Sequence, residues 1–462
     1  MSELSKEQIE QNFAEINPPL SKAEAVFEAN RCLYCYDAPC MHACPTHIDV
    51  PSFIKKIASG NLHGSARVIF DANPIGGSCA RVCPVEVLCE GACVEKTLMD
   101  KPIEIGRLQR YATDHAIESG KTIFEKGKSN GKSVGIIGSG PAGLSCATYL
   151  ARLGYDVTVY EKRELAGGLD TYGMAEYKMT QKDSLDEVGM VEDLGVKFKL
   201  NCEVVSEPSA VADGLSLGKI TVQFKLNDTN NGVQPSATAD GSDLHDALFL
   251  GVGLGATRDL NIEGEDLDGV MDALAFIEKV KTRNWNSVPI GKTVAVIGAG
   301  NTAIDAVTQA KRLGAEKVLL IYRRTEKDIS AYDYEYELAK KDGIEFVWQT
   351  SPIAVLGNEK VSGLKCKKSD GTEFEIACDM VIKAIGQQKQ IAFFQNIGIE
   401  FNEKGQVAVN EIMQTSNPKI FAGGDCVNGG AEAVDAAQMG KLAAQGIHFS
   451  LFGESVKFAG GS

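Results

Sequence analysis

Two glycine-rich motifs, each set between an apolar run and a helical pattern, constrain the fold of this chain more than any other feature. In "KSVGIIGSGPAGLSCATYLARLGYDVTVYEK" (132–162), Gly138, Gly140 and Gly143 follow an apolar run and open a helix. Such glycines let the backbone turn tightly and approach a pyrophosphate at the helix N-terminus. Glu161 ends the next apolar run, where a carboxylate can accept hydrogen bonds from a ribose diol. This unit predicts a dinucleotide-binding Rossmann domain.

The second motif lies in "KTVAVIGAGNTAIDAVTQAKRLGAEKVLLIYRR" (292–324), with Gly298 and Gly300 followed by alanine at the third position. Where the first unit has its carboxylate, this one has Arg323, with Arg324 next to it. A carboxylate would repel a 2′-phosphate, whereas a guanidinium binds it through paired hydrogen bonds. The arginines therefore favour NADPH over NADH. The alternative is that both arginines are simply solvated at a strand end.

A carboxylate in the first unit and arginines in the second favour FAD at the first site and NADPH at the second. The run "AGGD" near the C-terminus supports FAD, because Asp425 can hold the ribityl or pyrophosphate region of a flavin. The alternative is that Asp425 only caps the helix expected near Ala431. A distant segment can close a domain of this kind. We expect the chain to leave the first domain near residue 266 and to return near residue 388.

Two groups of cysteines precede these units, in a region over residues 1–130 that looks helical. The stretch "CLYCYDAPCMHACP" holds Cys32, Cys35, Cys40 and Cys44, and "CARVCPVEVLCEGAC" holds Cys79, Cys83, Cys89 and Cys93. In a reducing cytosol, clustered thiols are more often metal ligands than disulfides. Eight thiols suit two four-iron clusters, and zinc, which prefers paired C-x2-C units, is the alternative. Small buried hydrophobic residues are the expectation for Cys146, Cys202, Cys366, Cys378 and Cys426.

The charge and hydropathy of the chain exclude several other classes of function. A net charge of −15 disfavours general binding to nucleic acid or to an anionic membrane. The polar start lacks a signal-peptide core, and no apolar run approaches the ~18 residues that span a bilayer. We therefore expect a cytoplasmic protein with no nucleic acid or membrane partner. Residues 125–133 read as a linker, and residues 227–243 as a polar loop within a strand-rich region.

Together these features resemble the flavin/iron–sulfur subunit of dihydropyrimidine dehydrogenase, within the broader glutamate synthase small-subunit-like family. The resemblance covers almost the whole chain and is most specific at "RCLYCYDAPCMHACPTHIDVPSFI", "NPIGGSCARVCPVEVLCEGAC" and "PIEIGRLQRYATD". It implies a multidomain α/β architecture like that of glutathione reductase, preceded by an α-helical domain with two [4Fe-4S] clusters (1–130). The FAD-binding domain would be discontinuous (131–265 and 388–462) and would enclose the NAD(P)H-binding domain (266–387).

The resemblance also implies that the two sets of cluster ligands are interleaved along the chain. One cluster would be held by Cys32, Cys35, Cys40 and Cys93. The other would be held by Cys44, Cys83 and Cys89, with Gln109 of "GRLQR" as an unusual fourth ligand. Spacing alone selects Cys79 for that fourth position. With interleaved ligands, the two clusters would link distant segments of one small helical domain and so stabilise it.

The cofactor-binding positions of the family fall on definite residues of this chain. For FAD they are Gly138, Gly140, Gly143, Glu161, Gly168 and Asp425. For NADPH they are Gly298, Gly300, Asn301, Thr302, Arg323 and Arg324. One departure is "YGMAEYKMT" (172–180), which stands where relatives usually have a glycine–isoleucine–proline segment beside the flavin.

The function implied is that of an electron-entry subunit. Such a chain would oxidise NADPH, pass the hydride to FAD and send single electrons through two clusters to a partner FMN/iron–sulfur subunit that reduces uracil or thymine. Two copies of each subunit are expected. The chain ends at Ser462 without room for a ~250-residue FMN barrel, so we do not expect it to reduce pyrimidines alone. Hydride transfer needs no acid/base pair, so no catalytic side chain is predicted.

Two other interpretations remain open at the level of the sequence. The first is the electron-input subunit of another enzyme, such as glutamate synthase or a ferredoxin–NADP oxidoreductase. The second belongs to a different class, a non-enzymatic zinc- or nucleotide-binding scaffold.

Overall fold

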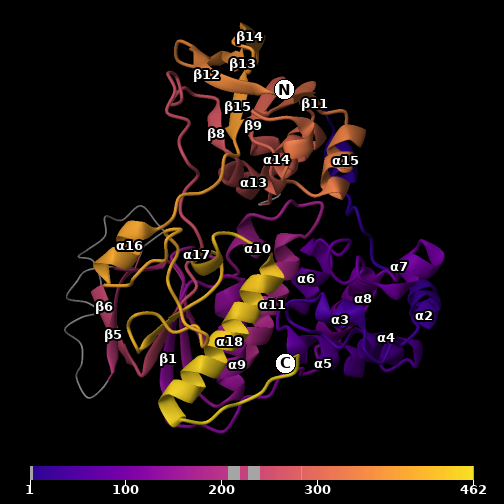
Figure 1. The fold of residues 1–462 in the computed structure, drawn as a ribbon, viewed down its shortest axis with the longest axis vertical. Helices are drawn as coiled ribbons and strands as arrows, with labels where there is room; N and C mark the ends of the chain where they lie inside the picture. The colour runs from indigo at the N-terminus through magenta and orange to yellow at the C-terminus, as the bar shows by residue number, and fades with distance from the viewer. Residues whose placement is uncertain (1–3, 206–218, 227–239, 282–283, 461–462) are drawn as a thin grey trace. The chain divides into compact units, whose positions relative to one another are not determined.

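A computed structural model describes the chain in four stretches, residues 4–205, 219–226, 240–281 and 284–460 (Figure 1). The chain divides into two compact units, each built from segments that are distant in the sequence. One contains Met1–Ile16, Tyr172–Gln181 and Gly255–Gln388, and the other contains Asn17–Thr171, Lys182–Leu254 and Lys389–Ser462. The domain boundaries expected near residues 130, 266 and 388 stay predictions.

The N-terminal region is helical, as the sequence predicts. Its helices are α1 (Lys6–Asn12), α2 (Lys22–Arg31), α3 (Pro39–His42), α4 (Val50–Ala58), α5 (Leu62–Ala72), α6 (Gly76–Val82), α7 (Val94–Met99) and α8 (Ile105–Glu118). Side chains fix several of their starts. Ser5 and Ser21 form capping boxes at α1 and α2, and Asp49 caps α4. The apolar faces of α2, α4, α5 and α8 bury one common core, which includes Phe53 and Leu108.

The first parallel sheet has the strand order β16–β7–β1–β2–β3. Its strands are β1 (Ser133–Ile137), β2 (Asp156–Tyr160), β3 (Lys197–Lys199), β7 (Ala247–Leu250) and β16 (Ile420–Ala422). Helix α9 (Pro141–Arg152) connects β1 to β2, and the long helix α18 (Ala433–Phe452) packs against α9 (Figure 1). Because β16 pairs with β7, a segment near the C-terminus completes the sheet that β1 begins. This Rossmann-like domain is therefore discontinuous, as expected.

The same unit contains several shorter elements. They are α10 (Leu169–Tyr172), α11 (Gln181–Asp193), α16 (Ile391–Asn396), α17 (Asp425–Asn428) and the antiparallel strands β4 (Cys202–Val204), β5 (Ile220–Leu226) and β6 (Asp240–His245). The last residue of α10, Tyr172, and the first residue of α11, Gln181, belong to the other unit. The loop expected over residues 227–243 lies mostly outside the described residues. Its described part, 240–243, is the beginning of β6 rather than a loop. The segment 125–133 has no helix, and β1 begins at its last residue, Ser133.

The other unit repeats the parallel architecture with the strand order β11–β10–β9–β15–β8. Its elements are β8 (Val270–Asp272), α13 (Ala273–Lys281), η2 (Trp285–Ser287), β9 (Thr293–Ile297), α14 (Asn301–Arg312), β10 (Lys317–Ile321), η3 (Glu326–Asp328), α15 (Asp333–Lys341), β11 (Glu345–Val347), β12 (Thr350–Gly357), β13 (Val361–Lys368), β14 (Glu373–Ala377) and β15 (Met380–Lys383). Strands β12–β14 form an antiparallel sheet. The strand predicted within 379–387 is β15, which is fully buried.

Helix α1 packs in this unit. Its side chains Ile9 and Phe13 are buried in the same core as α14, and Phe13 stacks on Trp285 with ring centroids 5.1 Å apart. Within the stretches of chain that the structure describes, no helix combines the length and the apolar character needed to cross a membrane.

Candidate cofactor sites

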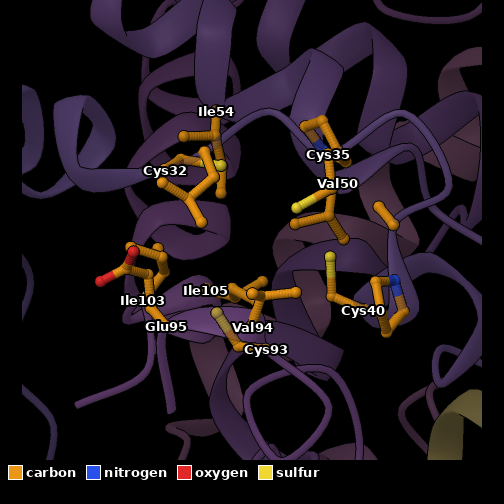
Figure 2. Close-up of a pocket in the computed structure, with 14 residues that line it drawn as sticks. Cys32, Cys35, Cys40, Val50, Ile54, Cys93, Val94, Glu95, Ile103 and Ile105 are labelled. Atoms are coloured by element: carbon orange, nitrogen blue, oxygen red, sulfur yellow. The ribbon is translucent and has the colours of Figure 1, made fainter. Parts of the chain in front are cut away.

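Four cysteines from separate elements line one cavity, which we call the first cage: Cys32, Cys35, Cys40 and Cys93. Cys32 follows α2, Cys35 lies in the next loop, Cys40 is in α3, and Cys93 directly precedes α7. Figure 2 shows their sulfur atoms turned toward one space, with Val50, Ile54, Ile103 and Ile105 as apolar walls. The space between these side chains, counted together with the adjoining open solvent, is about 360 Å³.

A local turn brings Cys32 and Cys35 to the same side of the chain. Between them Tyr34 has a φ of 50°, a left-handed conformation that is uncommon for any residue but glycine. The Tyr34 hydroxyl donates a hydrogen bond to the Ala29 carbonyl at 3.1 Å and so holds the turn against α2. Burial and the neighbouring cysteines raise the pKa of the Cys40 thiol to about 12. Thiols of this kind lose their protons when a metal binds.

A second cavity gathers the remaining cysteines of the region. Its lining includes Cys44, Cys83, Cys89 and both candidates for the fourth ligand, Gln109 and Cys79. These five residues are the second cage. The two cavities divide the residues in the same way as the interleaved ligand sets that the family resemblance implies.

Gln109 enters the second cage from α8 with a fixed amide. The side chain is buried, and Nε2 donates a hydrogen bond to the Gly76 carbonyl at 2.7 Å. The amide oxygen is therefore the atom left for a ligand. Cys79 lies in α6, four residues before Cys83, and is 3% exposed. Nearby on α18, burial lowers the pKa of Lys441 to about 8, while Cys44 acts in the opposite direction.

The donor sets of both cages fit iron–sulfur clusters. In the described parts of the chain, no three histidine, cysteine or carboxylate side chains are arranged to share a single metal ion. A four-iron cluster takes one ligand at each iron, so its ligands surround a volume rather than a point. Thiols placed around an apolar cavity are such a set.

The first glycine motif forms a tight turn between β1 and α9. Gly138 has a φ of 95°, and a Cβ atom at Gly143 would lie 2.1 Å from the Gly138 carbonyl oxygen. Gly140 precedes α9, and Gly168 approaches it so closely that a Cβ at Gly168 would lie 2.7 Å from the Gly140 Cα. The backbone thus leaves the N-terminus of α9 open to a phosphate group.

Glu161 follows β2 and is held beside this motif. Its carboxylate accepts hydrogen bonds from the Ser139 N–H at 3.1 Å, from the Ser139 hydroxyl at 2.6 Å and from the Arg163 N–H at 3.0 Å. A carboxylate has room for further donors, so a ribose diol can be added to this set. Ser139 and Arg163 were not foreseen from the sequence, since their donors become visible only in three dimensions.

Asp425 is the first residue of the short helix α17, at the carboxyl end of β16. A Cβ at the preceding Gly424 would lie 3.1 Å from the Cβ of Ala142 in the first turn of α9. The sheet therefore brings Asp425 next to the glycine motif, although the two are far apart in sequence. Burial raises the pKa of Asp425, and its Oδ1 accepts a hydrogen bond from Ala431 N–H at 3.4 Å.

The second glycine motif has the same geometry at the N-terminus of α14. Gly298 has a φ of 134°, and a Cβ there would lie 2.2 Å from the Ala384 carbonyl oxygen. Gly300 precedes α14, and the Asn301 side chain accepts a hydrogen bond from the Tyr332 N–H at 3.1 Å. Thr302 follows in the first turn, half-buried. Arg323 and Arg324 follow β10 and are exposed, the position from which a guanidinium can reach a ribose phosphate.

A buried ion cluster in the same unit went unnoticed at the level of sequence. Lys178 Nζ lies 2.7 Å from Asp305 Oδ1 and 2.5 Å from Glu335 Oε1. The Tyr177 hydroxyl also donates to Asp305, at 2.9 Å. Burial raises the pKa of Glu335 to about 7. The residues come from the segment 172–181, α14 and α15, so no local sequence pattern could have linked them.

Comparison with known proteins gives two family matches. Residues 132–440 match the family model described as pyridine nucleotide-disulphide oxidoreductase. Residues 9–121 match the model for dihydropyrimidine dehydrogenase domain II, 4Fe-4S cluster. The helical region that contains both cages and the region that contains the two parallel sheets are thus matched by separate family models.

Full-length relatives give the same picture. The chain is 32% identical over 443 residues to the NAD-dependent dihydropyrimidine dehydrogenase subunit PreT homolog of Salmonella typhi, covering 96% of this chain and 98% of that protein. It is 34% identical over 470 residues to the glutamate synthase [NADPH] small chain of Escherichia coli, covering 94% and 93%. Among solved structures, T. acidophilum thioredoxin reductase matches in fold with a TM-score of 0.55 and 22% identity, covering 69% of this chain and 98% of that one.

Proposed function

The chain belongs to the pyridine nucleotide-disulphide oxidoreductase family and carries an N-terminal 4Fe-4S domain, and from this premise we propose that it is the electron-input subunit of a dihydropyrimidine dehydrogenase. As a member it is an NAD(P)H-dependent flavin oxidoreductase. The proposal adds the count of two clusters, the choice of NADPH, the partner and the final substrate.

One observation supports the electron path more than any other. Val434, in the first turn of α18, lies in the lining of the second cage together with Cys44 and Cys83. Helix α18 follows Asp425 and packs on α9, so the second cage adjoins the elements that would hold the flavin. Direct adjacency of this kind suits transfer between two bound redox groups.

The side chains would divide the work of binding. FAD accepts a hydride as an electron pair, and iron–sulfur clusters carry electrons singly. Glu161 and Asp425 would hold the flavin nucleotide, and the N-terminus of α14 would hold the nicotinamide nucleotide. The first cage would hold one cluster through its four thiolates. Cys44, Cys83 and Cys89 would hold the second, with Gln109 as fourth ligand.

NADPH is proposed as the electron donor because of Arg323 and Arg324. Both are exposed beyond the end of β10, where they can meet a nucleotide bound at the second glycine motif. The two relatives differ here, since one is named as NAD-dependent and the other as NADPH-dependent. The arginines favour the phosphorylated nucleotide.

The proposed partner is an FMN/iron–sulfur subunit that reduces uracil or thymine, assembled with two copies of each chain. The relatives' names as subunit and small chain support a partner. Exposed apolar side chains of the N-terminal region could contribute to such a contact if they form one surface. They are Leu33 and Tyr36 in the cysteine loop and Leu98 and Met99 at the end of α7.

The test uses the chain prepared without oxygen, alone and co-expressed with candidate partners. Alone, it should oxidise NADPH with an artificial one-electron dye and leave uracil unchanged. With the FMN partner, uracil should be reduced at the expense of NADPH. Reduction of uracil by the isolated chain would contradict the division of labour.

The runner-up function is electron input to glutamate synthase. The 34% identity with the glutamate synthase small chain favours it. Under this alternative, the chain would co-purify with a large amidotransferase subunit. Glutamate would then form from glutamine and 2-oxoglutarate with NADPH, and uracil would not react.

A further inference from the structure

Lys441, on α18, is a buried lysine whose hydrogen bonds go to backbone carbonyl groups. The residue is 1% exposed. Its Nζ donates hydrogen bonds to the carbonyl oxygens of Thr46 and Ala459, both at 3.1 Å, and lies 5.8 Å from the centre of the Tyr149 ring. Among the residues that the structure describes, no carboxylate lies within ion-pair distance of Nζ. An ammonium group buried in this way costs free energy unless a negative charge compensates it.

The position of the ammonium indicates where that negative charge arises. Thr46 follows Cys44 by two residues, and the Cys44 sulfur lies 3.3 Å from the Thr46 hydroxyl. Lys441 therefore rests against the loop that carries one thiol of the second cage. Three thiolates and an iron–sulfur core would give this cage the missing negative charge.

We infer that Lys441 is the built-in counter-charge of the second cluster and raises its reduction potential. The inference rests on the proposed function, since it requires a cluster in the second cage. Each electron added to a cluster makes it more negative, so a fixed positive charge beside it favours the reduced form. Lys441 is thus a positioning and tuning residue, and it binds no iron itself.

Several other charged groups around the two cages have partners of their own. Near the second cage, Glu90 accepts a hydrogen bond from the Gly106 N–H at 3.0 Å, and Glu187 accepts from Gly77 at 2.6 Å. At the first cage, the nearby cation Arg31 is paired with Glu28 at 2.5 Å. Within the described residues, Lys441 is a buried cation beside the second cage with no carboxylate at ion-pair distance, so we expect its charge to act mainly on a cluster held there.

The experiment compares the variants Lys441→Met and Lys441→Arg with the wild type. Lys404→Met is the control for loss of a positive charge, because Lys404 is an exposed lysine in the same unit. Each full-length protein is reconstituted without oxygen and analysed for iron, labile sulfide and FAD. Redox titration followed by electron paramagnetic resonance then gives the midpoint potential of each cluster. The wild type must first contain about eight irons per chain, since about four would overturn the two-cluster proposal rather than this inference.

We expect Lys441→Met to shift the second cluster to a more negative midpoint potential and to leave the first unchanged. Lys441→Arg should restore the wild-type value, and Lys404→Met should change neither cluster. If Lys441→Met folds with FAD and the first cluster but loses the second, rescue by Lys441→Arg supports the same role. Two intact clusters with unchanged potentials, or an Lys441→Arg protein that behaves like Lys441→Met, would overturn it.

Discussion

The Glu187 carboxylate on α11 accepts a hydrogen bond from the Gly77 N–H at 2.6 Å, at the N-terminus of α6. It also accepts from the Ser78 N–H at 3.1 Å and from the Ser78 hydroxyl at 2.5 Å. Gly77 leaves room for this contact, because a Cβ there would lie 2.9 Å from Glu187 Oε1. One carboxyl group thus ties the helix that carries Cys79 to helix α11.

This contact predicts a specific dependence of stability on pH. Burial raises the pKa of Glu187 to about 8 in the folded protein, from 4.5. Between these values the folded state holds a proton that the unfolded state has released, so the free energy of unfolding falls as pH rises. Glu187→Gln, which cannot ionise, should remove most of this pH dependence, a change in the free energy of unfolding on the order of a few kcal/mol between pH 4.5 and 8.

Thermal unfolding followed by release of flavin fluorescence, measured at several pH values, checks this expectation. Asp156→Asn serves as the control. Asp156 forms an exposed ion pair with Lys197, so its carboxylate remains solvated in the folded protein. If stability changes with pH in the same way in the wild type and in Glu187→Gln, the pKa of Glu187 is the same in the folded and unfolded states. That result would contradict the prediction.

The second cage predicts unequal roles for Gln109 and Cys79. Because the Gly76 carbonyl fixes the Gln109 amide, its oxygen is the atom left to bind iron. Gln109→Ala should change the paramagnetic spectrum of the second cluster or reduce the iron content from about eight toward about four per chain. Cys79→Ala should leave both unchanged. The reverse pattern would assign the fourth position to Cys79.

The arginines after β10 predict a selective loss of NADPH binding. Charge-assisted hydrogen bonds to a phosphate contribute about 1.5–3 kcal/mol each, so Arg323→Ala and Arg324→Ala should each raise the KM for NADPH by roughly tenfold or more. The KM for NADH should change by less than about threefold. Lys317→Ala, at the opposite end of β10, is the matched control. Equal effects on both nucleotides would argue against a 2′-phosphate site.

The buried Lys178–Asp305–Glu335 cluster predicts a large effect on stability. Lys178→Met removes the cation between two buried carboxylates, which should cost about 3–5 kcal/mol. Lys340→Met breaks an exposed pair with Glu337 and should cost less than about 1 kcal/mol.

Tryptophan fluorescence during denaturant unfolding measures this difference. Both tryptophans of the chain, Trp285 and Trp348, lie in the unit that contains the ion cluster, so the signal reports on that unit. Similar losses of stability in Lys178→Met and Lys340→Met would mean that the buried cluster contributes no more than a surface pair.

Local sequence patterns were sufficient for the elements whose chemistry is local. Gly138 and Gly298 could be recognised because a tight turn with positive φ between a strand and a helix requires glycine there. The helices α4 and α8 follow from apolar spacing and, at α4, from the cap at Asp49. The cysteine groups indicated metal binding because thiols clustered so densely in one short segment are typical of metal ligands.

Only the tertiary structure decided which distant residues meet. Val434 reaches the second cage from near the C-terminus, Lys441 donates a hydrogen bond to the Thr46 carbonyl, and Lys178 is buried between α14 and α15. No sequence period links such pairs, because their proximity depends on how whole helices and sheets pack. The sequence by itself determined the kinds of cofactor this protein can hold, since backbone turns and ligand types are local. Packing decided which side chains surround each one, because burial and charge depend on every neighbour in space.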